Sequence, residues 1–375
     1  MHKPRLLILG PLPPPVGGVE TVTKAVLESR ALSGFEVSHC DTTKGRPKQT
    51  QGKFDLGNMQ WAIIHFSRMW KSCWRFRPHA IYMPVTATWS GFWRDAVLAL
   101  IGKLAGAVVV GHVHGAWFDR ILDAKGITRV MVRLSLRLFD ALLMLGTPWQ
   151  RLVESSGYPG RVLVLPPTLR KEVYDTGTSF RRSYDVDQPR GLFVGQVGER
   201  KGIFELLDAL GELKRAGKPT PMTVVGPPEG EGEWEAVMRR WTELDLQSLV
   251  RFAGPLEGET LYEEFRKADY LVLPSHSEGL PIVFLEAGAF GLPVIGTPVG
   301  AIDDLLKNEE NALLVEPGNV SQLRTALTRI QCNARDREKL GTALRAAVAV
   351  YQPEAVCTRL ADSVRAVLAR EAIRQ

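Results

Sequence analysis

Residues 271–304 read LVLPSHSEGLPIVFLEAGAFGLPVIGTPVGAIDD, and this stretch decides the fold. Residues 271–273 form a short apolar run, typical of a buried parallel strand. Apolar residues then recur at helical spacing over residues 282–290, behind a proline suited to a first helical position. A Gly-Leu-Pro stop precedes a second apolar run at residues 294–296. The pattern predicts a strand, a helix and a parallel strand, and therefore an α/β fold.

The start of this helix is the first candidate binding site. We expect the helix to begin at Gly279, where unpaired backbone N–H groups and the helix dipole favour an anion such as phosphate. The amides of Gly279 and Leu280 are predicted to face that anion. Glu278 precedes the helix, and Glu286 lies about one and a half turns inside it. Since helical side chains lean toward the N-terminus, Glu286 is expected to reach a pair of sugar hydroxyls.

These residues resemble a known family. Glu278-Gly279-Leu280-Pro281 followed by Glu286 is similar to the EGxP-xxxx-E signature of retaining family-4 glycosyltransferases with the GT-B fold. The resemblance implies two facing Rossmann-like domains with a cleft between them, and a nucleotide-diphosphate sugar as donor. It also implies that Glu286 holds the ribose hydroxyls and that Glu278 lies under the donor sugar.

Length and composition agree with two domains. The chain has 375 residues, of which 45% are hydrophobic, enough for two cores of ordinary size. With the resemblance, we expect an acceptor-binding domain at 1–168, a linker at 169–189 and a nucleotide-sugar-binding domain at 190–352. A C-terminal helix at 353–375 is expected to pack back on the first domain, as in the family.

Charge is divided unevenly along the chain. Residues 1–170 hold 22 Lys and Arg against 10 Asp and Glu, a formal charge of +12, whereas residues 171–375 hold 25 against 31, or −6. A basic half indicates nucleic acid, an anionic membrane surface or a diphosphate-bearing substrate. Because the basic half lacks a recognised nucleic-acid motif, we expect no nucleic-acid partner.

Two further loops are predicted to bind donor phosphates. Gly17 and Gly18 lie between a strand and a helix, and they resemble the GGxE loop of the family, which faces the interdomain cleft. Gly195 follows the strand that opens the second domain, and Arg200 and Lys201 stand at the entry of the next helix. Their placement resembles the diphosphate-binding loop of the family, although Gln196 stands where the family often has arginine.

A histidine and several aromatic residues are assigned to the first domain's side of the site. His114 ends a predicted strand and is followed by Gly115, which resembles the HG element of the family. Side chains at the carboxyl ends of parallel strands point toward ligands, so His114 is predicted to contact the donor sugar or phosphate. Candidate acceptor-binding residues are Trp89, Trp93, Arg94 and Trp117.

A predicted basic amphipathic helix at residues 61–76 combines tryptophans with arginine and lysine. Its apolar side chains either pack on the sheet or rest on anionic lipid, since Trp with Lys and Arg favours the membrane interface. The hypothesis is that the acceptor is a saccharide, or a lipid-linked saccharide, of the cell envelope or an exopolysaccharide. We expect a cytoplasmic protein that is peripheral on the inner face of the cell membrane.

The predicted reaction uses no cofactor. Fixed cations and amides stabilise the departing diphosphate, so His114, Glu278, Arg200 and Lys201 are the candidate catalytic residues and no metal is expected. Four cysteines without metal-like spacing agree with that expectation. The family implies retention of configuration, and we expect a UDP-sugar rather than a GDP-sugar. Two alternatives stay open: a sugar-nucleotide epimerase of the same fold, and a non-catalytic sugar-binding protein.

Overall fold

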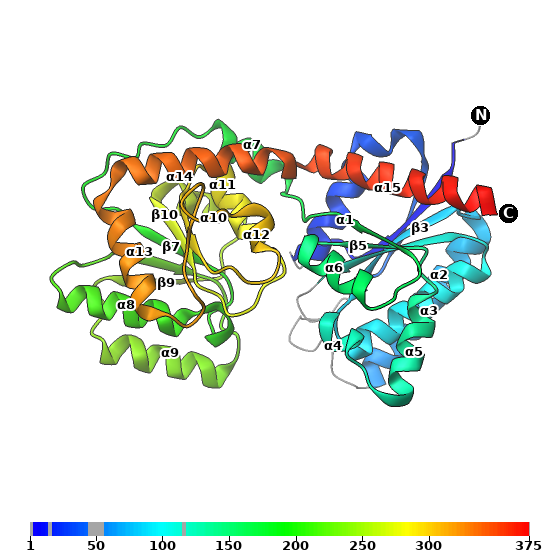
Figure 1. The fold of residues 1–375 in the computed structure, drawn as a ribbon, viewed down its shortest axis with the longest axis horizontal. Coiled ribbons are helices and arrows are strands. Elements are labelled where there is room, and N and C mark those ends of the chain that lie inside the picture. Colours follow the sequence, from blue (N-terminus) through cyan, green and yellow to red (C-terminus); the bar gives the residue numbers. More distant parts are fainter. Residues whose placement is uncertain (1–2, 14–16, 44–55, 115–117, 375) are drawn as a thin grey trace. The chain divides into compact units, whose positions relative to one another are not determined.

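The computed structural model describes residues 3–13, 17–43, 56–114 and 118–374. They divide into two compact units, each built around its own parallel sheet (Figure 1). The first unit comprises Met1–Arg170 and Tyr351–Gln375, and the second comprises Lys171–Val350. The chain therefore enters the second unit once and returns to the first for its last helix.

The first unit has a six-stranded parallel sheet in the order β2-β1-β3-β4-β5-β6. Its strands are β1 (Arg5–Gly10), β2 (Glu36–Asp41), β3 (Ala80–Thr86), β4 (Val108–His114), β5 (Ala141–Met144) and β6 (Arg161–Val164). The helices are α1 (Gly18–Glu28), η1 (Arg30–Gly34), α2 (Leu56–Phe76), α3 (Trp89–Leu104), α4 (Phe118–Leu122), α5 (Gly126–Leu136), α6 (Thr147–Ser155) and α15 (Pro353–Arg374).

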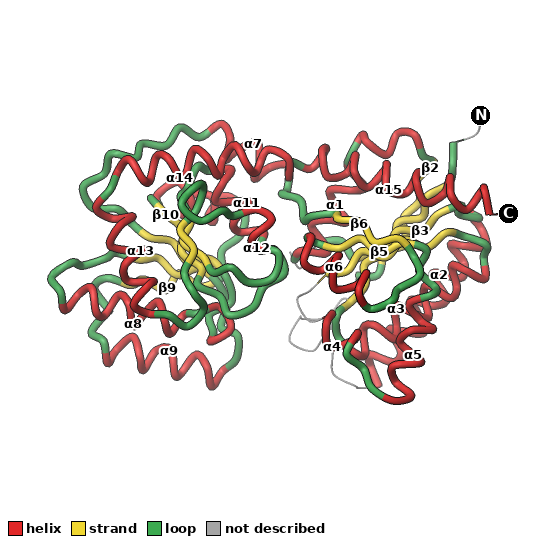
Figure 2. The backbone as a smooth tube through the Cα atoms, viewed as in Figure 1, coloured by secondary structure: helices red, strands yellow, loops and turns green. Residues whose placement is uncertain are grey.

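Each face of this sheet carries a separate core, because successive side chains of a strand point to opposite faces. Leu7 and Leu9 of β1 belong to the core covered by α2, α3, α4, α5 and α6. Leu6 and Ile8 belong to the core covered by α1 and α15. Helix α15 thus supplies one layer of the first unit, and Figure 2 shows helices on both sides of the strands.

The second unit repeats this architecture with a sheet in the order β12-β11-β10-β7-β8-β9, again parallel. Its strands are β7 (Gly191–Val194), β8 (Met222–Val225), β9 (Val250–Gly254), β10 (Tyr270–Leu273), β11 (Val294–Gly296) and β12 (Leu313–Leu314). The helices are α7 (Lys171–Ser179), η3 (Glu199–Lys201), α8 (Ile203–Arg215), α9 (Glu231–Glu243), α10 (Glu259–Lys267), α11 (Ile282–Ala289), α12 (Ile302–Leu305), α13 (Val320–Cys332), α14 (Ala334–Ala347) and η4 (Val348–Tyr351).

The predicted helix start at Gly279 is wrong by three residues. Helix α11 begins at Ile282, and Pro281 is its N-cap, with φ −66° and ψ 122°. The carbonyl of Gly279 accepts a hydrogen bond of 2.8 Å from the backbone N–H of Ala301, in the segment after β11. Residues 279–281 therefore lie in the loop before α11 and do not form its first turn.

The predicted linker at 169–189 also differs from the structure. Residues 171–179 form α7, which packs on α10 and α11 of the second unit. Beyond α7, the Arg182 guanidinium donates hydrogen bonds to the carbonyls of Phe265 at 2.8 Å, Phe290 at 2.9 Å and Ala268. This segment is therefore part of the second unit, because its polar side chains bond to that unit's backbone.

Candidate functional site

The candidate site lies where the strand order of the second sheet reverses. From β7 the chain proceeds to β8 and β9 on one side, then returns to place β10 on the other side of β7. Parallel pairing of β7 with β10 puts the loops that follow both strands at the same edge of the sheet. Such a switch point is where open α/β sheets bind ligands. Arg200 and Lys201 come from the first loop, and Glu278 from the second.

An ion pair joins the two loops. Lys201 Nζ donates a hydrogen bond to Glu278 Oε1, and the side chains are 13% and 8% exposed. Ser275 Oγ donates to the same oxygen at 2.8 Å, and Thr297 Oγ1 donates to the Ser275 carbonyl at 2.6 Å. Because Ser275 and Thr297 are fully buried, the carboxylate is held in one place.

Arg200 lies beside this pair in a more open position. Its Nε donates to Glu229 Oε1 at 2.8 Å, its Nη2 to Gln196 Oε1 at 3.0 Å and its Nη1 to the Ser277 carbonyl at 3.4 Å. The Arg200 side chain is 28% exposed, so an anion can reach it. Gln196, which departs from the family pattern, therefore orients this arginine.

Two glycines let the site loops approach other backbone segments. Gly202, at the N-cap of α8, has φ +73°, and a Cβ there would overlap the carbonyl oxygen of Pro274. Gly300 has φ +65°, and a Cβ there would overlap the carbonyl oxygen of Glu278. Any other residue would be strained at both positions. These glycines fix the spacing of the loops that carry Lys201 and Glu278.

The other donor-site residues predicted in the second unit fall on the same edge. Leu280 is buried in the loop before α11, and Glu286 is 8% exposed in the second turn of that helix. Gly195 follows β7, and a Cβ there would meet Leu273 and Lys201 only at 3.7–3.8 Å. Glycine is therefore not required at Gly195 by packing, in contrast to Gly202 and Gly300. The structure brings this donor set together around the β7 and β10 loops.

His114 ends β4 in the first unit, as predicted, and lies against a buried histidine. Its ring centroid is 4.1 Å from that of His112. His112 is tied on both nitrogens, to Tyr82 Oη at 2.7 Å and to the Leu165 carbonyl at 3.0 Å, and is structural. Burial lowers the pKa of His114 to about 4, so its imidazole is neutral near pH 7.

The other first-unit predictions lie at the ends of β1 and β3. Gly17 is the N-cap of α1, and Gly18 is its first residue. Trp89 and Trp93 stack at 6.5 Å on the first turns of α3. Arg94 donates to Asp95 at 2.6 Å and to Thr86 at 3.0 Å. Trp117 lies outside the described residues.

Several residues of the site were not predicted from the sequence. Ser275, Thr297 and Gly300 orient Glu278 and its loop, and Glu229 holds Arg200. Ser275 directly follows the strand and its proline, which is a usable local signal. Glu229 lies 29 residues from Arg200, and no local pattern connects the two. In the described part of the chain, no group of three His, Cys, Asp or Glu residues is arranged to hold a metal ion.

A family model for glycosyl transferases group 1 matches residues 178–346. The second unit belongs to this family. A curated relative, D-inositol 3-phosphate glycosyltransferase from Thermomonospora curvata, is 33% identical over 155 residues, which cover 40% of this chain and 36% of that protein. The chain thus spans between a third and a half of the length of the curated relatives that it matches.

Solved structures extend the likeness in fold to both units. A glycosyltransferase from Rickettsia africae has a TM-score of 0.78 and 15% identity, covering 98% of this chain and 99% of that one. HepE from Anabaena, in complex with UDP, has a TM-score of 0.71 and 15% identity, covering 97% and 100%. The GT-B fold predicted from residues 271–304 is confirmed. Within the described residues, every helix is too short or too polar to cross a bilayer.

Proposed function

We propose that the protein is a retaining, metal-independent hexosyltransferase that moves a sugar from a nucleoside diphosphate sugar to a saccharide acceptor. The observation that carries this proposal is the meeting of Arg200, Lys201 and Glu278 at the β7 and β10 switch point. Membership of the second unit in the group 1 glycosyl transferases supports it. The UDP complex of a structural neighbour supports a uridine nucleotide as donor.

In this proposal, the costly event is departure of the nucleoside diphosphate. Arg200 and Lys201 place two positive charges at the sheet edge, where the leaving oxygens gain negative charge as the glycosidic bond breaks. The backbone N–H groups before α11, from Gly279 and Leu280, add fixed dipoles. Groups held in place before the reaction stabilise this charge without reorganisation, a contribution of about 3–4 kcal/mol for one donor. The two cations take the role that a divalent ion would otherwise have.

Retention follows from a same-face reaction in which the leaving phosphate helps to deprotonate the acceptor hydroxyl. Glu278 is the nearest carboxylate, but one of its oxygens already accepts hydrogen bonds from Lys201 and Ser275. These bonds reduce its nucleophilicity, so Glu278 is assigned to position the donor sugar and Lys201. Glu286 is assigned to the ribose hydroxyls, and His114, as a neutral imidazole, to the donor sugar or phosphate.

The acceptor in this proposal is a saccharide or lipid-linked saccharide of the cell envelope or an exopolysaccharide. In this proposal the protein is cytoplasmic and peripheral, and it meets the acceptor at the inner face of the cell membrane. Support comes from the charge of +12 over residues 1–170 and from the exposed tryptophans of α2, Trp70 and Trp74. Trp89 and Trp93 are the proposed acceptor-stacking pair, since aromatic rings suit sugar faces.

Donor choice is tested by thermal shift with UDP-, GDP- and ADP-sugars. A ligand that binds only the native state raises the melting temperature, by an amount that grows with its concentration over Kd. We expect a shift with UDP-sugars that is lost in Lys201→Met and kept in Lys218→Met, an exposed lysine of the same unit. No shift with any sugar nucleotide would contradict the proposal. Epimerised sugar formed without acceptor would identify an epimerase instead.

A further inference from the structure

Exposed apolar side chains gather on three helices of the first unit. Among the described residues, large hydrophobic side chains that are exposed lie on α2, α3 and α5, apart from Val37, Val350 and Ile373. Helices α2 and α3 pack against each other, and all three helices contribute to the core on one face of the sheet. We call their exposed side the outer helical surface. It contains Ile63, Ile64, Trp70, Trp74, Trp89, Val97, Leu100, Leu104, Ile127, Val130, Met131 and Leu134.

Helix α5 gives the clearest part of this surface. Ile127, Val130, Met131 and Leu134 follow the i, i+3, i+4, i+7 spacing of one helical stripe, and each is about half exposed or more. Val132 and Leu136, on the other side of the helix, are buried in the core. Helix α5 thus has two apolar faces, and only one of them is covered within its unit. An uncovered apolar stripe of this kind marks an interaction surface.

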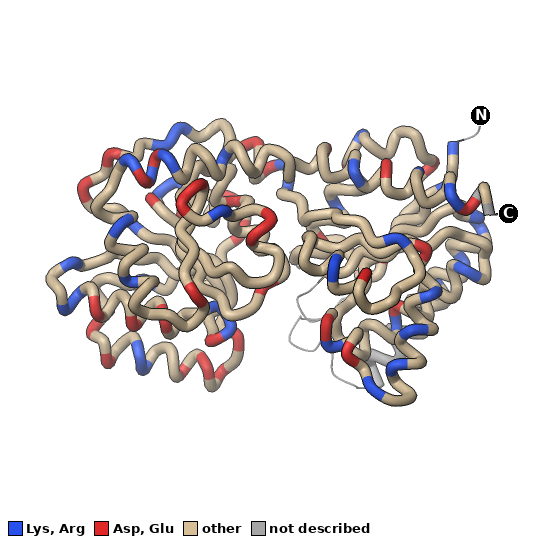
Figure 3. The backbone as a smooth tube through the Cα atoms, viewed as in Figure 1, with Lys and Arg blue, Asp and Glu red and all other residues tan. Residues whose placement is uncertain are grey.

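The exposed charges on the three helices are positive. Their sequences contain a single acidic residue, Asp95, which is 1% exposed and paired with Arg94. Arg68, Lys71 and Arg75 of α2 are exposed, and Arg129, Arg133 and Arg137 are exposed along α5 and at its C-cap. Figure 3 shows α2 and α5 with basic residues and without acidic ones. The outer helical surface is therefore apolar and cationic together.

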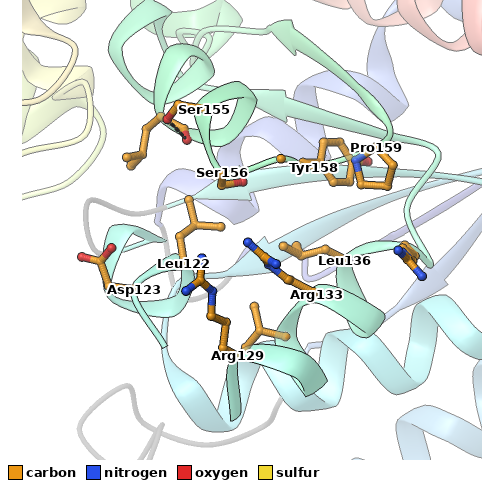
Figure 4. Close-up of a pocket in the computed structure, with 13 residues that line it drawn as sticks. Leu122, Asp123, Arg129, Arg133, Leu136, Ser155, Ser156, Tyr158 and Pro159 are labelled. Carbon is orange, nitrogen blue, oxygen red and sulfur yellow. Dashed lines mark hydrogen bonds between the residues drawn. The ribbon is translucent and has the colours of Figure 1, made fainter. Parts of the chain in front are cut away.

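A pocket of about 460 Å³ adjoins this surface, between α5 and the segment that follows α6. Arg129, Arg133 and Arg137 line it at a spacing of four residues, and Figure 4 shows Arg129 and Arg133 on one side of the pocket with Ser156 and Tyr158 on the other. Among the described residues none of the three arginines forms an ion pair, and the pocket has one acid, Asp123. The hydroxyls of Ser155, Ser156 and Tyr158 already donate to carbonyls, so the guanidinium groups are left to bind an anion.

We propose that the outer helical surface docks on an anionic lipid bilayer and that the arginine pocket receives a lipid phosphate. Tryptophan and aliphatic side chains suit the headgroup boundary, and arginines are attracted to anionic lipids. Guanidinium groups also match phosphate geometry. A second copy of the chain is disfavoured as occupant, because self-pairing would bring like charges together without an exposed acid on these helices.

This inference rests on the proposed location at the membrane face, but it is tested without donor or acceptor. Binding is measured by co-sedimentation with vesicles of phosphatidylcholine and of an equimolar mixture with phosphatidylglycerol. We expect binding to the mixed vesicles that falls with added salt. Failure here would leave the thermal shift with UDP-sugars intact, so the two proposals fail separately.

Variants separate the two parts of the surface. Arg129→Gln/Arg133→Gln should weaken binding to mixed vesicles about fivefold for each arginine removed. Trp74→Ser/Leu134→Ser should weaken it about tenfold or more through lost apolar burial. Matched controls on α15 are Arg359→Gln/Arg370→Gln and Ile373→Ser, which replace exposed residues on the helix covering the other face of the sheet. These controls should bind as the wild type does.

The outcomes decide the proposal. Wild-type protein that stays in the supernatant with mixed vesicles would overturn it, as would equal losses in the α5 and α15 variants. Unchanged binding by Arg129→Gln/Arg133→Gln would show that the arginine pocket does not bind a lipid phosphate. A solution dimer that Trp74→Ser/Leu134→Ser converts to a monomer would show that a second copy covers this surface instead.

Discussion

Lys201 and Glu278 form an ion pair across two loops that lie 77 residues apart in the sequence. The pair joins the end of η3 to the loop after β10, and both side chains are largely removed from water. Lysine and glutamate in this position carry the proposed chemistry and also hold the site's geometry. Substitutions should therefore affect turnover and stability separately, and a double-variant cycle can divide the two.

The first prediction concerns Lys201→Met. Loss of this cation should lower kcat/KM by about 10²–10³, as removal of one charge-stabilising donor does elsewhere. The variant leaves the Glu278 carboxylate buried beside Ser275 alone, which should cost about 1–3 kcal/mol in the free energy of unfolding. Lys201→Met/Glu278→Gln should recover most of that free energy and none of the activity. Recovery of activity would contradict the role assigned to Lys201; Lys218→Met is the control.

The second prediction concerns Glu286→Gln. The carboxylate is assigned to the ribose hydroxyls, so its replacement should raise KM for the donor and lower kcat/KM about tenfold or more, since hydrogen bonds to a charged group contribute about 1.5–3 kcal/mol. The KM of the acceptor should stay the same. Steady-state kinetics with each substrate varied in turn measure this, and an effect confined to the acceptor would place Glu286 elsewhere.

The third prediction is a pH dependence through His114, whose pKa is lowered to about 4 by burial. In the unfolded chain an imidazole takes up a proton below about pH 6.5. Between these values the unfolded state binds more protons, so the free energy of unfolding falls as pH is lowered from about 6.5 toward 4. Urea unfolding at several pH values should show a smaller fall for His114→Gln than for wild type. An identical fall in both would mean that His114 is solvated.

The fourth prediction concerns Gly300→Ala. The new Cβ would overlap the Glu278 carbonyl oxygen at a residue with φ +65°, so the loop that carries Glu278 must move. Activity should fall about tenfold or more, because small displacements of catalytic groups are costly. Gly230→Ala is the control, since Gly230 is extended and a Cβ there meets nothing within 4 Å. Equal activity in both variants would show that this loop tolerates displacement.

The fifth prediction concerns the segment after α7. Arg182→Met leaves the carbonyls of Phe265, Ala268 and Phe290 without their donor and should lower the free energy of unfolding by about 2–4 kcal/mol. Arg181→Met, at the exposed neighbouring position, should change it by less than about 0.5 kcal/mol. Urea denaturation of both variants makes the comparison. Equal stabilities would mean that the segment acts as a free linker.

Sequence reasoning predicted the parts of this molecule that local pattern determines. Apolar runs at 271–273 and 294–296 and the amphipathic helix at 61–76 gave the strands β10 and β11 and most of α2, because burial and periodicity are local. The GT-B fold followed from the motif around Glu278. The sequence predicts no strand over β2, since β2 lies at the sheet edge, has one buried side chain among six and lacks an apolar run.

Predictions failed where a distant residue determines the local structure. The polar composition of residues 171–190 indicates a loop, but the partners of Arg182 lie 83 to 108 residues away. Pro281 is compatible with a first helical position, but it is the N-cap of α11, and the preceding Gly279 carbonyl bonds to Ala301 instead of to a residue of the helix. The roles of the site residues remain predictions that the variants above test.

The core of the first unit is complete only when helix α15, the last helix, has been added. Cys357, Leu360 and Val364 fill the core on the α1 face of the first sheet, and they are separated from β6 by the whole second unit. On the ribosome, the second unit is synthesised completely before this layer emerges. Until then this face of the amino-terminal sheet is covered by α1 and η1 but not by α15. Chaperone demand should therefore be concentrated on nascent chains that have not yet reached residue 353.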